Sequence, residues 1–192
     1  QFGNAGCYGE TKAALEAMGG NALGVPTHLG EPDDLRTLVD ATVDRFGGVD
    51  IVVNNAATAL AQMIEDITPE AWQKVFDVNL RGPVLLVQAA IPHLRASEHG
   101  SVINVVSVGA FLFSSYTSMY ASAKAGLLQY TRSMAAELAP DGIRVNALAP
   151  GTVDTDMVRA NPPEAQERMA NAALLRRAAH PDELVGPALL LA

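Results

Sequence analysis

The sequence predicts an α/β fold in which helices flank a doubly wound parallel sheet. Helix-like and strand-like segments alternate along the 192 residues, which is the pattern of α/β domains. Two candidate strands, 49–54 and 101–107, are nearly unbroken apolar runs, typical of strands covered on both faces. Hydrophobic residues make up 49% of the chain and charged residues 18%, so a disordered chain is excluded. No linker or repeat interrupts the pattern, and we expect one domain over 1–192.

Several short elements are predicted before the middle of the chain. They are a helix over 10–18, a short strand over 22–26, a helix from 32 to 46 and the strand over 49–54. Asp33 and Asp34 suit the first turn of the second helix, where the helix dipole favours acids. Gly47 follows the last apolar residue of that helix and is expected to end it.

Longer helices are predicted in the second half. The expected elements are a helical tract from 69 to 95 disturbed near Asn79, Gly82-Pro83 and Pro92, the strand 101–107, a helix over 118–138, the strand 144–148, and helical stretches from 161 and over 181–192. Thr68 followed by Pro69 is a typical start for the first of these helices, since proline suits the first helical position.

Charge and cysteine content narrow the partners and the compartment. The net charge of −8 argues against nucleic acid and against an anionic membrane surface. Cys7 is the single cysteine, which fits a reducing compartment. No apolar run reaches the roughly 20 residues of a membrane span, and no secretory signal pattern opens the chain. We therefore expect a cytoplasmic protein. The four histidines show no metal-ligand spacing.

Three side chains suggest proton-transfer chemistry. Tyr120 and Lys124 lie four residues apart on the helix 118–138 and share a helix face. An ammonium beside a phenol would lower the tyrosine pKa from about 10 toward neutrality, so that Tyr120 could exchange a proton. Taken alone, Tyr120 and Lys124 could equally be a chance pair on a solvent-exposed helix. Ser107 makes the site more specific, because it ends a strand, and open parallel sheets bind ligands at strand ends.

The sequence resembles the short-chain dehydrogenase/reductase family in five motifs that occur in order. They are Val53-Asn54-Asn55-Ala56-Ala57, then Asn79 in Val78-Asn79-Leu80, then Ser107 with Tyr120 and Lys124, then Arg144-Val145-Asn146 with Pro150-Gly151, and finally Thr155. The similarity runs from about residue 10 to residue 192. It implies a Rossmann-like sheet.

The resemblance also implies a role for each matching residue. Tyr120 would be the general acid/base, and Lys124 would lower its pKa and hydrogen-bond the nicotinamide ribose. Ser107 would orient the substrate oxygen, and Asn79 would hold a water in a proton relay. The implied cofactor is NAD or NADP. Its contacts would be His28, Leu29, Asn54, Asn55, Ala56, Ala57, Tyr120, Lys124, Pro150, Gly151, Val153 and Thr155.

The N-terminus departs from the family pattern. The family begins with a strand and a Gly-rich turn, whereas the glycines here fall at Gly3, Gly6 and Gly9 with a different spacing. We expect a loop there, or a join across residues that this chain lacks, because the first crossover and the second strand do not fit between Gly9 and Ala22. The family's last strand is also missing. We expect the chain to be the ordered part of a longer protein, or else a truncated fragment.

These observations predict an NAD(P)-dependent oxidoreductase that acts on a small-molecule carbonyl or secondary alcohol. Two alternatives are an acyl-carrier 3-ketoacyl reductase and a non-catalytic relic of the same scaffold. The net charge of −8 weakens the first alternative, because carrier proteins are acidic. The intact set of catalytic residues weakens the second. Apolar side chains such as Trp72 and Tyr130 further suggest helix pairing in a homodimer or homotetramer.

Overall fold

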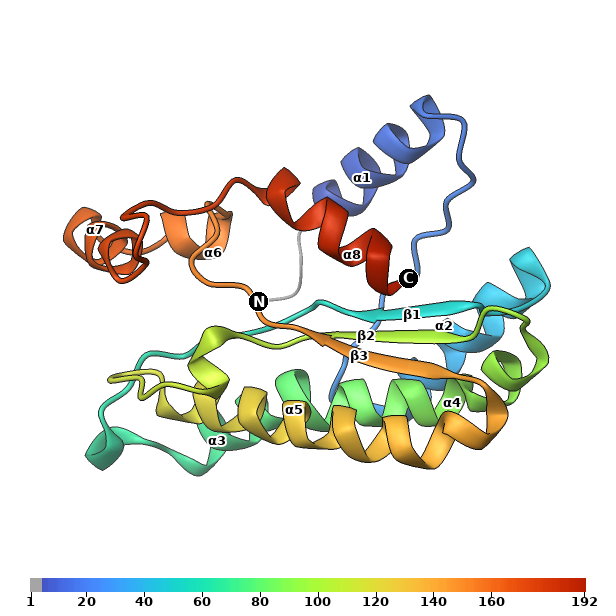
Figure 1. The fold of residues 1–192 in the computed structure, drawn as a ribbon, viewed down its shortest axis with the longest axis horizontal. Coiled ribbons are helices and arrows are strands. Elements are labelled where there is room, and N and C mark those ends of the chain that lie inside the picture. The colour runs from blue at the N-terminus through green and yellow to red at the C-terminus, as the bar shows by residue number, and fades with distance from the viewer. Residues whose placement is uncertain (1–4) are drawn as a thin grey trace.

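The computed structural model describes residues 5–192, and the side chains of residues 9–192. Within these residues the sheet has three parallel strands in the order β1-β2-β3 (Figure 1). The strands are β1 (Ile51–Asn54), β2 (Ser101–Val105) and β3 (Arg144–Leu148). Their register pairs Asn54 with Asn104 and Val105 with Leu148, so the carboxyl ends of all three strands lie at one edge. The predicted α/β fold with a parallel sheet is confirmed.

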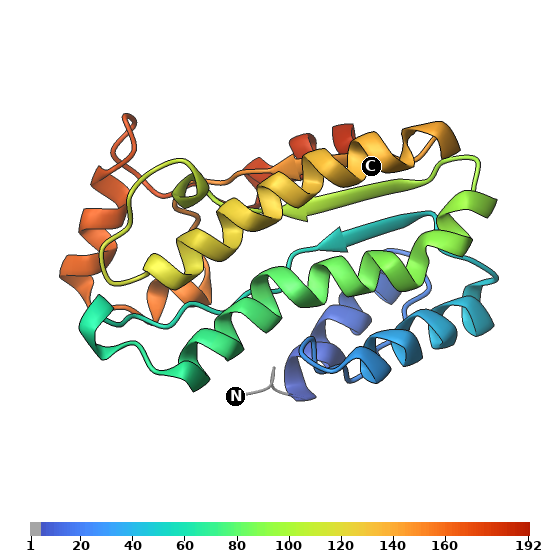
Figure 2. The same ribbon diagram turned by 90° about the horizontal axis from the view of Figure 1, so that it is seen from below.

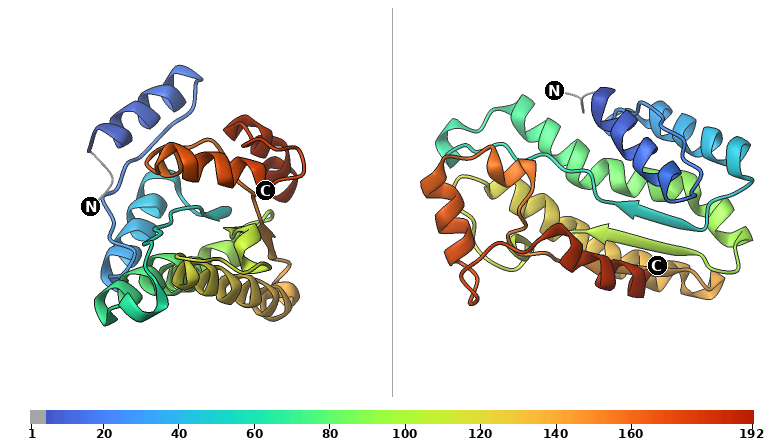
Figure 3. Two further views of the ribbon diagram at one scale, coloured as in Figure 1. Left: turned by 90° about the vertical axis from the view of Figure 1, so that its left-hand side faces the viewer. Right: turned by 90° about the horizontal axis from the view of Figure 1, so that it is seen from above.

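Helices lie on both sides of the sheet. The helices on one side are α2 (Pro32–Phe46), α3 (Pro69–Phe76), α4 (Gly82–Ala96) and α5 (Ser118–Leu138). Figure 2 shows α2, α4 and α5 side by side beneath the strands. On the other side are α1 (Ala5–Ala17) and α8 (Val185–Leu191), and α8 contacts β2 and β3 (Figure 3). Two short helices, α6 (Asp156–Arg159) and α7 (Pro163–Asn171), follow β3.

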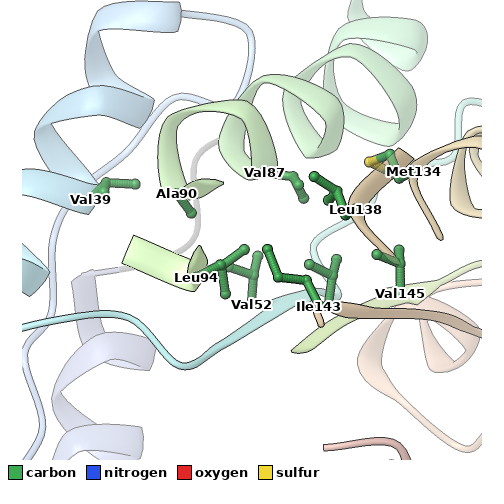
Figure 4. Packing of buried hydrophobic residues seen from close by; sticks show 10 residues of the cluster. Val39, Val52, Val87, Ala90, Leu94, Met134, Leu138, Ile143 and Val145 are labelled. Atoms are coloured by element: carbon green, nitrogen blue, oxygen red, sulfur yellow. The ribbon is translucent and has the colours of Figure 1, made fainter. Parts of the chain in front are cut away.

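The main core lies between the sheet and α2, α4 and α5. Its buried side chains include Val39, Val52, Val87, Ala90, Leu94, Met134, Leu138, Ile143 and Val145 (Figure 4). The strand β2 is buried almost throughout, as expected for a central parallel strand. On β1 the burial alternates, and Ile51 and Val53 remain 43% and 53% exposed on the face away from this core.

The helical tract after Pro69 divides where the sequence predicts disturbances. A π-helical segment, Asp77–Arg81, separates α3 from α4. Such single turns insert an extra residue into a helix and often occur at functional sites. A side chain at Gly82 would place its Cβ 2.5 Å from the backbone oxygen of Leu29, so this position requires glycine. The helix α4 continues through Pro92, where the sequence predicts another disturbance.

Other predicted bounds hold or shift by a few residues. The helix 118–138 and the strand 144–148 have the predicted bounds, and α2 ends at Gly47, which has a φ of 87°. The strand 49–54 begins at Ile51, and the strand 101–107 ends at Val105. None of the described helices is both long enough and apolar enough to cross a lipid bilayer.

Two predictions about the N-terminal part are wrong. Residues 22–26 form no strand, because among the described residues no neighbouring strand pairs with them. The glycine cluster is not a loop where the structure describes it, since Gly6 and Gly9 lie in α1. Gly3 lies outside the described residues. The short helix α6, which directly follows Thr155, has no counterpart in the sequence prediction.

Candidate active site

The loops that leave the three strands meet at the carboxyl edge of the sheet. Asn55 directly follows β1, Ser107 lies two residues beyond β2, and Pro150 lies two residues beyond β3. The backbone N–H of Val108 donates to the backbone oxygen of Pro150 at 3.0 Å, which joins the second and third loops. Parallel sheets present their ligands at this edge. The structure therefore brings these three sequence motifs to one place.

Ser107 is held in an extended conformation between β2 and a short 3₁₀ turn. The preceding residue, Val106, donates its N–H to the backbone oxygen of Leu148 at 2.8 Å, which continues the sheet pairing by one residue. The Ser107 Oγ accepts the N–H of Gly109 at 3.1 Å. Because the hydroxyl oxygen accepts this bond, its own proton remains available for another oxygen. This bond fixes the position of the Ser107 side chain.

Tyr120 and Lys124 lie one helical turn apart on α5, as their spacing predicts. The side chain of Lys124 is only 1% exposed, and its Nζ donates to the backbone oxygen of Val105 at 2.7 Å. The same Nζ lies 5.8 Å from the centre of the Tyr120 ring. A buried ammonium requires such partners, because leaving it unpaired is costly. Lys124 therefore links α5 to the end of β2 and keeps donors near Tyr120.

Burial shifts the pKa values of both residues. It lowers the pKa of Lys124 from 10.5 to about 8, since an apolar environment disfavours the charged ammonium. It raises the pKa of Tyr120 above 10.0, and a hydrogen bond with the Ser107 side chain offsets part of that rise. The lowered tyrosine pKa predicted from the neighbouring lysine is therefore wrong for this structure. Burial outweighs the hydrogen bond from Ser107, which favours the phenolate.

Asn79 is completely buried within the π-helical segment. Its Nδ2 donates to the backbone oxygens of Thr58 and Val75 at 2.8 and 2.7 Å. Its Oδ1 accepts the N–H of Thr58 at 3.2 Å. Asn79 thus ties the loop after β1 to the helical tract from two directions. The bond to Val75 is the local backbone bond typical of an asparagine within a helix, whereas the two bonds to Thr58 cross the fold.

A buried polar chain crosses the sheet behind these residues. The Asn54 Nδ2 donates to Asn104 Oδ1 at 2.8 Å, and the Asn104 Nδ2 donates to Thr131 Oγ1 at 2.9 Å. The Asn54 side chain is therefore hydrogen-bonded inside the protein. Asn104 and Thr131 were missed by the sequence analysis. An asparagine in the middle of the apolar strand 101–107 was the available signal.

The remaining predicted cofactor residues lie at the surface of the same edge. Asn55, Ala56 and Gly151 are exposed, and Ala57, Pro150 and Val153 are partly buried. Val153 forms an isolated parallel bridge with Ala179, and Thr155 lies at the start of α6. This bridge fixes the direction in which the chain leaves β3.

His28 and Leu29 lie in the turn before α2. The backbone N–H of His28 donates to Asp34 Oδ2 at 2.8 Å, and its ring Nδ1 accepts the N–H of Gly30 at 3.2 Å. The Leu29 backbone approaches Gly82 at the start of α4. These contacts hold the turn against the helix that follows the π-helical segment.

The chain matches a model of one protein family along almost its full length. The family is described as enoyl-(acyl carrier protein) reductase, and the match covers residues 2–192. Human dehydrogenase/reductase SDR family member 4 is 37% identical over 177 residues, which is 91% of this chain and 64% of that protein. A probable galactose dehydrogenase from Rhizobium meliloti is 38% identical over 160 residues, 82% of this chain and 62% of that protein. The chain thus spans less than two thirds of the length of these relatives.

Solved structures with a similar fold include members of the same group of dehydrogenases. A short chain dehydrogenase from Burkholderia cenocepacia, in complex with NADP, superposes with a TM-score of 0.92 at 30% identity. The match covers 99% of this chain and 77% of that one. A blue fluorescent protein from a metagenomic library, in complex with NADPH, gives a TM-score of 0.90 at 28% identity, covering 98% and 75% of the two chains. By family model, relatives and fold, the chain belongs to the short-chain dehydrogenase/reductase family.

Proposed function

We propose that this chain belongs to an NAD(P)-dependent oxidoreductase that interconverts a carbonyl and a secondary alcohol. The observation that carries the proposal is the grouping of Ser107, Tyr120 and Lys124 at the carboxyl edge of the sheet. The phenol has a hydrogen-bonded serine beside it and a buried lysine one turn away. Proton transfer to a substrate oxygen needs a group of this kind in a fixed position.

The residues at the strand ends fit a dinucleotide. Asn55 and Ala56 are exposed, and Gly151 has open space where a side chain would begin, so a flat ligand can approach the backbone closely. Lys124 has three N–H donors and uses one on Val105, which leaves two for ribose hydroxyls. We propose His28 and Leu29 as contacts for the adenine end. The other proposed contacts are Asn54, Asn55, Ala56, Ala57, Tyr120, Lys124, Pro150, Gly151, Val153 and Thr155.

The proposed roles follow from the donors and acceptors of each side chain. A bound NADH or NADPH would supply a hydride to the carbonyl carbon. In that reduction the Tyr120 phenol gives its proton to the carbonyl oxygen, and the Ser107 hydroxyl donates to the same oxygen. In the oxidation the phenolate accepts the proton of the alcohol. Lys124, charged below its pKa of about 8, favours that phenolate electrostatically.

Asn79 is proposed as a positioning residue. Both of its Nδ2 protons are used on backbone oxygens, and one lone pair of Oδ1 is used on Thr58. The second lone pair is available to accept a hydrogen bond from the relay water that the family resemblance implies. Its main effect would be to hold residues 55–58 in the conformation that faces the cofactor.

A 3-ketoacyl reductase that acts on an acyl carrier protein is the second candidate. One relative, from Synechocystis, is a 3-oxoacyl-[acyl-carrier-protein] reductase, and it is 35% identical over 145 residues. Docking an acidic carrier needs a basic surface, whereas this chain has a net charge of −8. One of its three lysines, Lys124, is also buried. We therefore favour a free small-molecule substrate.

We further propose a homodimer or homotetramer in the cytoplasm, without nucleic-acid or membrane partners. Trp72 on α3 and Tyr130 on α5 are 47% and 48% exposed, and the Trp72 ring stacks on Phe76 at a centroid distance of 4.3 Å. Exposed aromatic side chains on packed helices suit a protein interface. Light scattering of the full-length protein tests this assembly, and a monomer would contradict it.

Dinucleotide binding and turnover test the proposed activity. The full-length protein should melt at a higher temperature when NAD(H) or NADP(H) is in excess. A dinucleotide concentration of one hundred times the dissociation constant should raise the free energy of unfolding by about 2.7 kcal/mol. It should also consume the reduced dinucleotide when a ketone is present. No shift with either dinucleotide and no turnover of any carbonyl would contradict the proposal.

A further inference from the structure

A pocket lies at the start of α5, the helix that carries Tyr120. Its volume is about 210 Å³, and it is lined by Gln62, Met63, Ile64, Ser114, Ser115, Tyr116 and Ser118. Ser118 begins α5 two residues before Tyr120, so the helix that carries the proton donor also closes this pocket. The backbone N–H of Gln62 donates to the backbone oxygen of Tyr116 at 2.7 Å and joins the two walls.

One polar atom of this pocket lacks a partner. Among the residues that the structure describes, Gln62 Oε1 is the one buried side-chain nitrogen or oxygen without a hydrogen bond. Folded proteins satisfy nearly all such atoms, because a buried unpaired acceptor is unfavourable. An unpaired acceptor in a pocket wall is suited to a donor group of a ligand.

The rest of the lining indicates which ligands suit the pocket. None of its seven residues carries a charge. Met63, Ile64 and Tyr116 provide apolar surface. Ser114 is already hydrogen-bonded to the Thr117 hydroxyl. The pocket therefore suits a largely apolar, uncharged group with a donor for Gln62, whereas a carboxylate would find no cationic partner there.

The loop next to this pocket is also apolar. Phe111, Leu112 and Phe113 are 60%, 65% and 96% exposed and precede Ser114 directly. Tyr116 is 60% exposed and has a φ of 65°, which a non-glycine residue rarely adopts. Strained, exposed backbone of this kind is concentrated at ligand-binding sites. An apolar substrate would cover part of this surface.

We propose that Gln62 determines substrate specificity by accepting a hydrogen bond from a hydroxyl on an otherwise apolar ketone or secondary alcohol. The inference rests on the proposed oxidoreductase function, because the substrate must reach Tyr120 with its reacting oxygen. The hydroxyl that Gln62 binds lies at the end of the substrate that is far from the reacting carbon. A polyhydroxylated sugar would leave several hydroxyls against the apolar residues of the pocket and is disfavoured.

Matched ketone pairs test the proposal. The first pair is 4-hydroxycyclohexanone and 4-methylcyclohexanone, and the second is 4-(4-hydroxyphenyl)butan-2-one and 4-(4-methylphenyl)butan-2-one. In each pair a methyl group replaces the hydroxyl at similar size. The wild-type full-length protein should favour the hydroxylated member of at least one pair, by about tenfold to a hundredfold in kcat/KM, the range expected for one buried hydrogen bond.

The variant Gln62→Met removes the acceptor and keeps the length of the side chain. It should abolish the preference for the hydroxylated ketone and leave kcat/KM for the methyl ketone within about threefold. Gln129→Met, at an exposed position on α5, is the matched control and should change neither value. The melting temperature of Gln62→Met should equal or exceed that of the wild type, because an unpaired buried acceptor is removed.

The outcomes separate this inference from the proposed function. Reduction of the methyl ketones, with a preference that Gln62→Met leaves unchanged, would overturn the role of Gln62 and keep the oxidoreductase. A wild-type preference for the methyl member of both pairs, or better turnover of galactose than of any ketone, would overturn it as well. Failure to reduce any ketone would remove the proposed function and the inference together.

Discussion

Two regions around Tyr120 differ in whether their buried polar groups are hydrogen-bonded. Behind the tyrosine, Lys124 and Asn79 are buried, and each is hydrogen-bonded to backbone oxygens of other elements. In front of it, the segment 111–116 exposes apolar side chains, and Gln62 leaves a buried acceptor unpaired. In the first region, here called the satisfied region, the protein itself supplies the hydrogen-bond partners. In the second, here called the open region, the unpaired acceptor is suited to a donor from a ligand. Mutations should therefore separate the chemical step from substrate choice.

The largest predicted effect is on Lys124. Lys124→Met removes the ammonium that favours the phenolate and the donors for a ribose, so kcat/KM should fall by about 10²- to 10⁴-fold, the usual range for acid–base catalysis. Steady-state kinetics with either dinucleotide measures this loss. Lys74→Met, at an exposed position on α3, is the control and should keep full activity. Activity of Lys124→Met near that of the wild type would contradict a catalytic role for the satisfied region.

The pKa of Lys124 predicts a pH dependence of stability. The folded pKa of about 8 lies below the ordinary value of 10.5, so the unfolded chain binds more protons between these pH values. Stability contributed at this site should therefore rise from pH 8 toward pH 10.5, by at most about 3 kcal/mol, and should be constant below pH 8. Urea unfolding of the wild type and of Lys124→Met at several pH values measures the difference. If the free energy of unfolding of the wild type, relative to that of Lys124→Met, fell between pH 8 and pH 10.5, the result would contradict a buried, destabilised ammonium.

Asn79 should matter for stability as well as for activity. Asn79→Ala leaves the N–H and oxygen of Thr58 and the oxygen of Val75 without this partner, which should lower the free energy of unfolding by about 1–3 kcal/mol. Asn55→Ala, at an exposed side chain of the same loop, should change it by less than about 0.5 kcal/mol. Equal effects of the two substitutions in urea unfolding would remove the distinction between buried and exposed positions.

The smallest effect on stability is expected at Phe113. Its side chain is 96% exposed, so Phe113→Ser should change the free energy of unfolding by less than about 0.5 kcal/mol. If the loop binds an apolar substrate, the same substitution should raise KM for the butanone ketones and leave kcat near that of the wild type. A loss of kcat with unchanged KM would place Phe113 in the catalytic region instead.

The sequence predicted the satisfied region better than the open one. Ser107, Tyr120 and Lys124 could be found because their residue types and spacing carry the chemistry. The helix 118–138 and the strand 144–148 followed from periodicity. The backbone oxygen of Val105 that anchors Lys124 leaves no mark in a sequence, since any residue supplies it. The direction of the Tyr120 pKa was wrong because it depends on burial, which spacing alone does not show.

Strand prediction failed where partners decide the outcome. Residues 22–26 have strand-like composition, but a strand forms only when its backbone groups pair with a neighbour. The residues 49–54 and 101–107 have similar composition, and they pair with each other. Gln62 gave no signal in the sequence, because only the folded walls of its pocket reveal that its oxygen is unpaired.

Replacing Tyr120 tests the central claim most directly. Tyr120→Phe removes one hydroxyl and keeps the ring that lies near Lys124, so melting temperature and dinucleotide binding should stay close to those of the wild type. With a good ketone substrate, kcat/KM should fall by about 10²- to 10⁴-fold, because the substitution removes the proposed proton donor. A Tyr120→Phe protein that folds, binds dinucleotide and reduces the ketone at the wild-type rate would contradict the account.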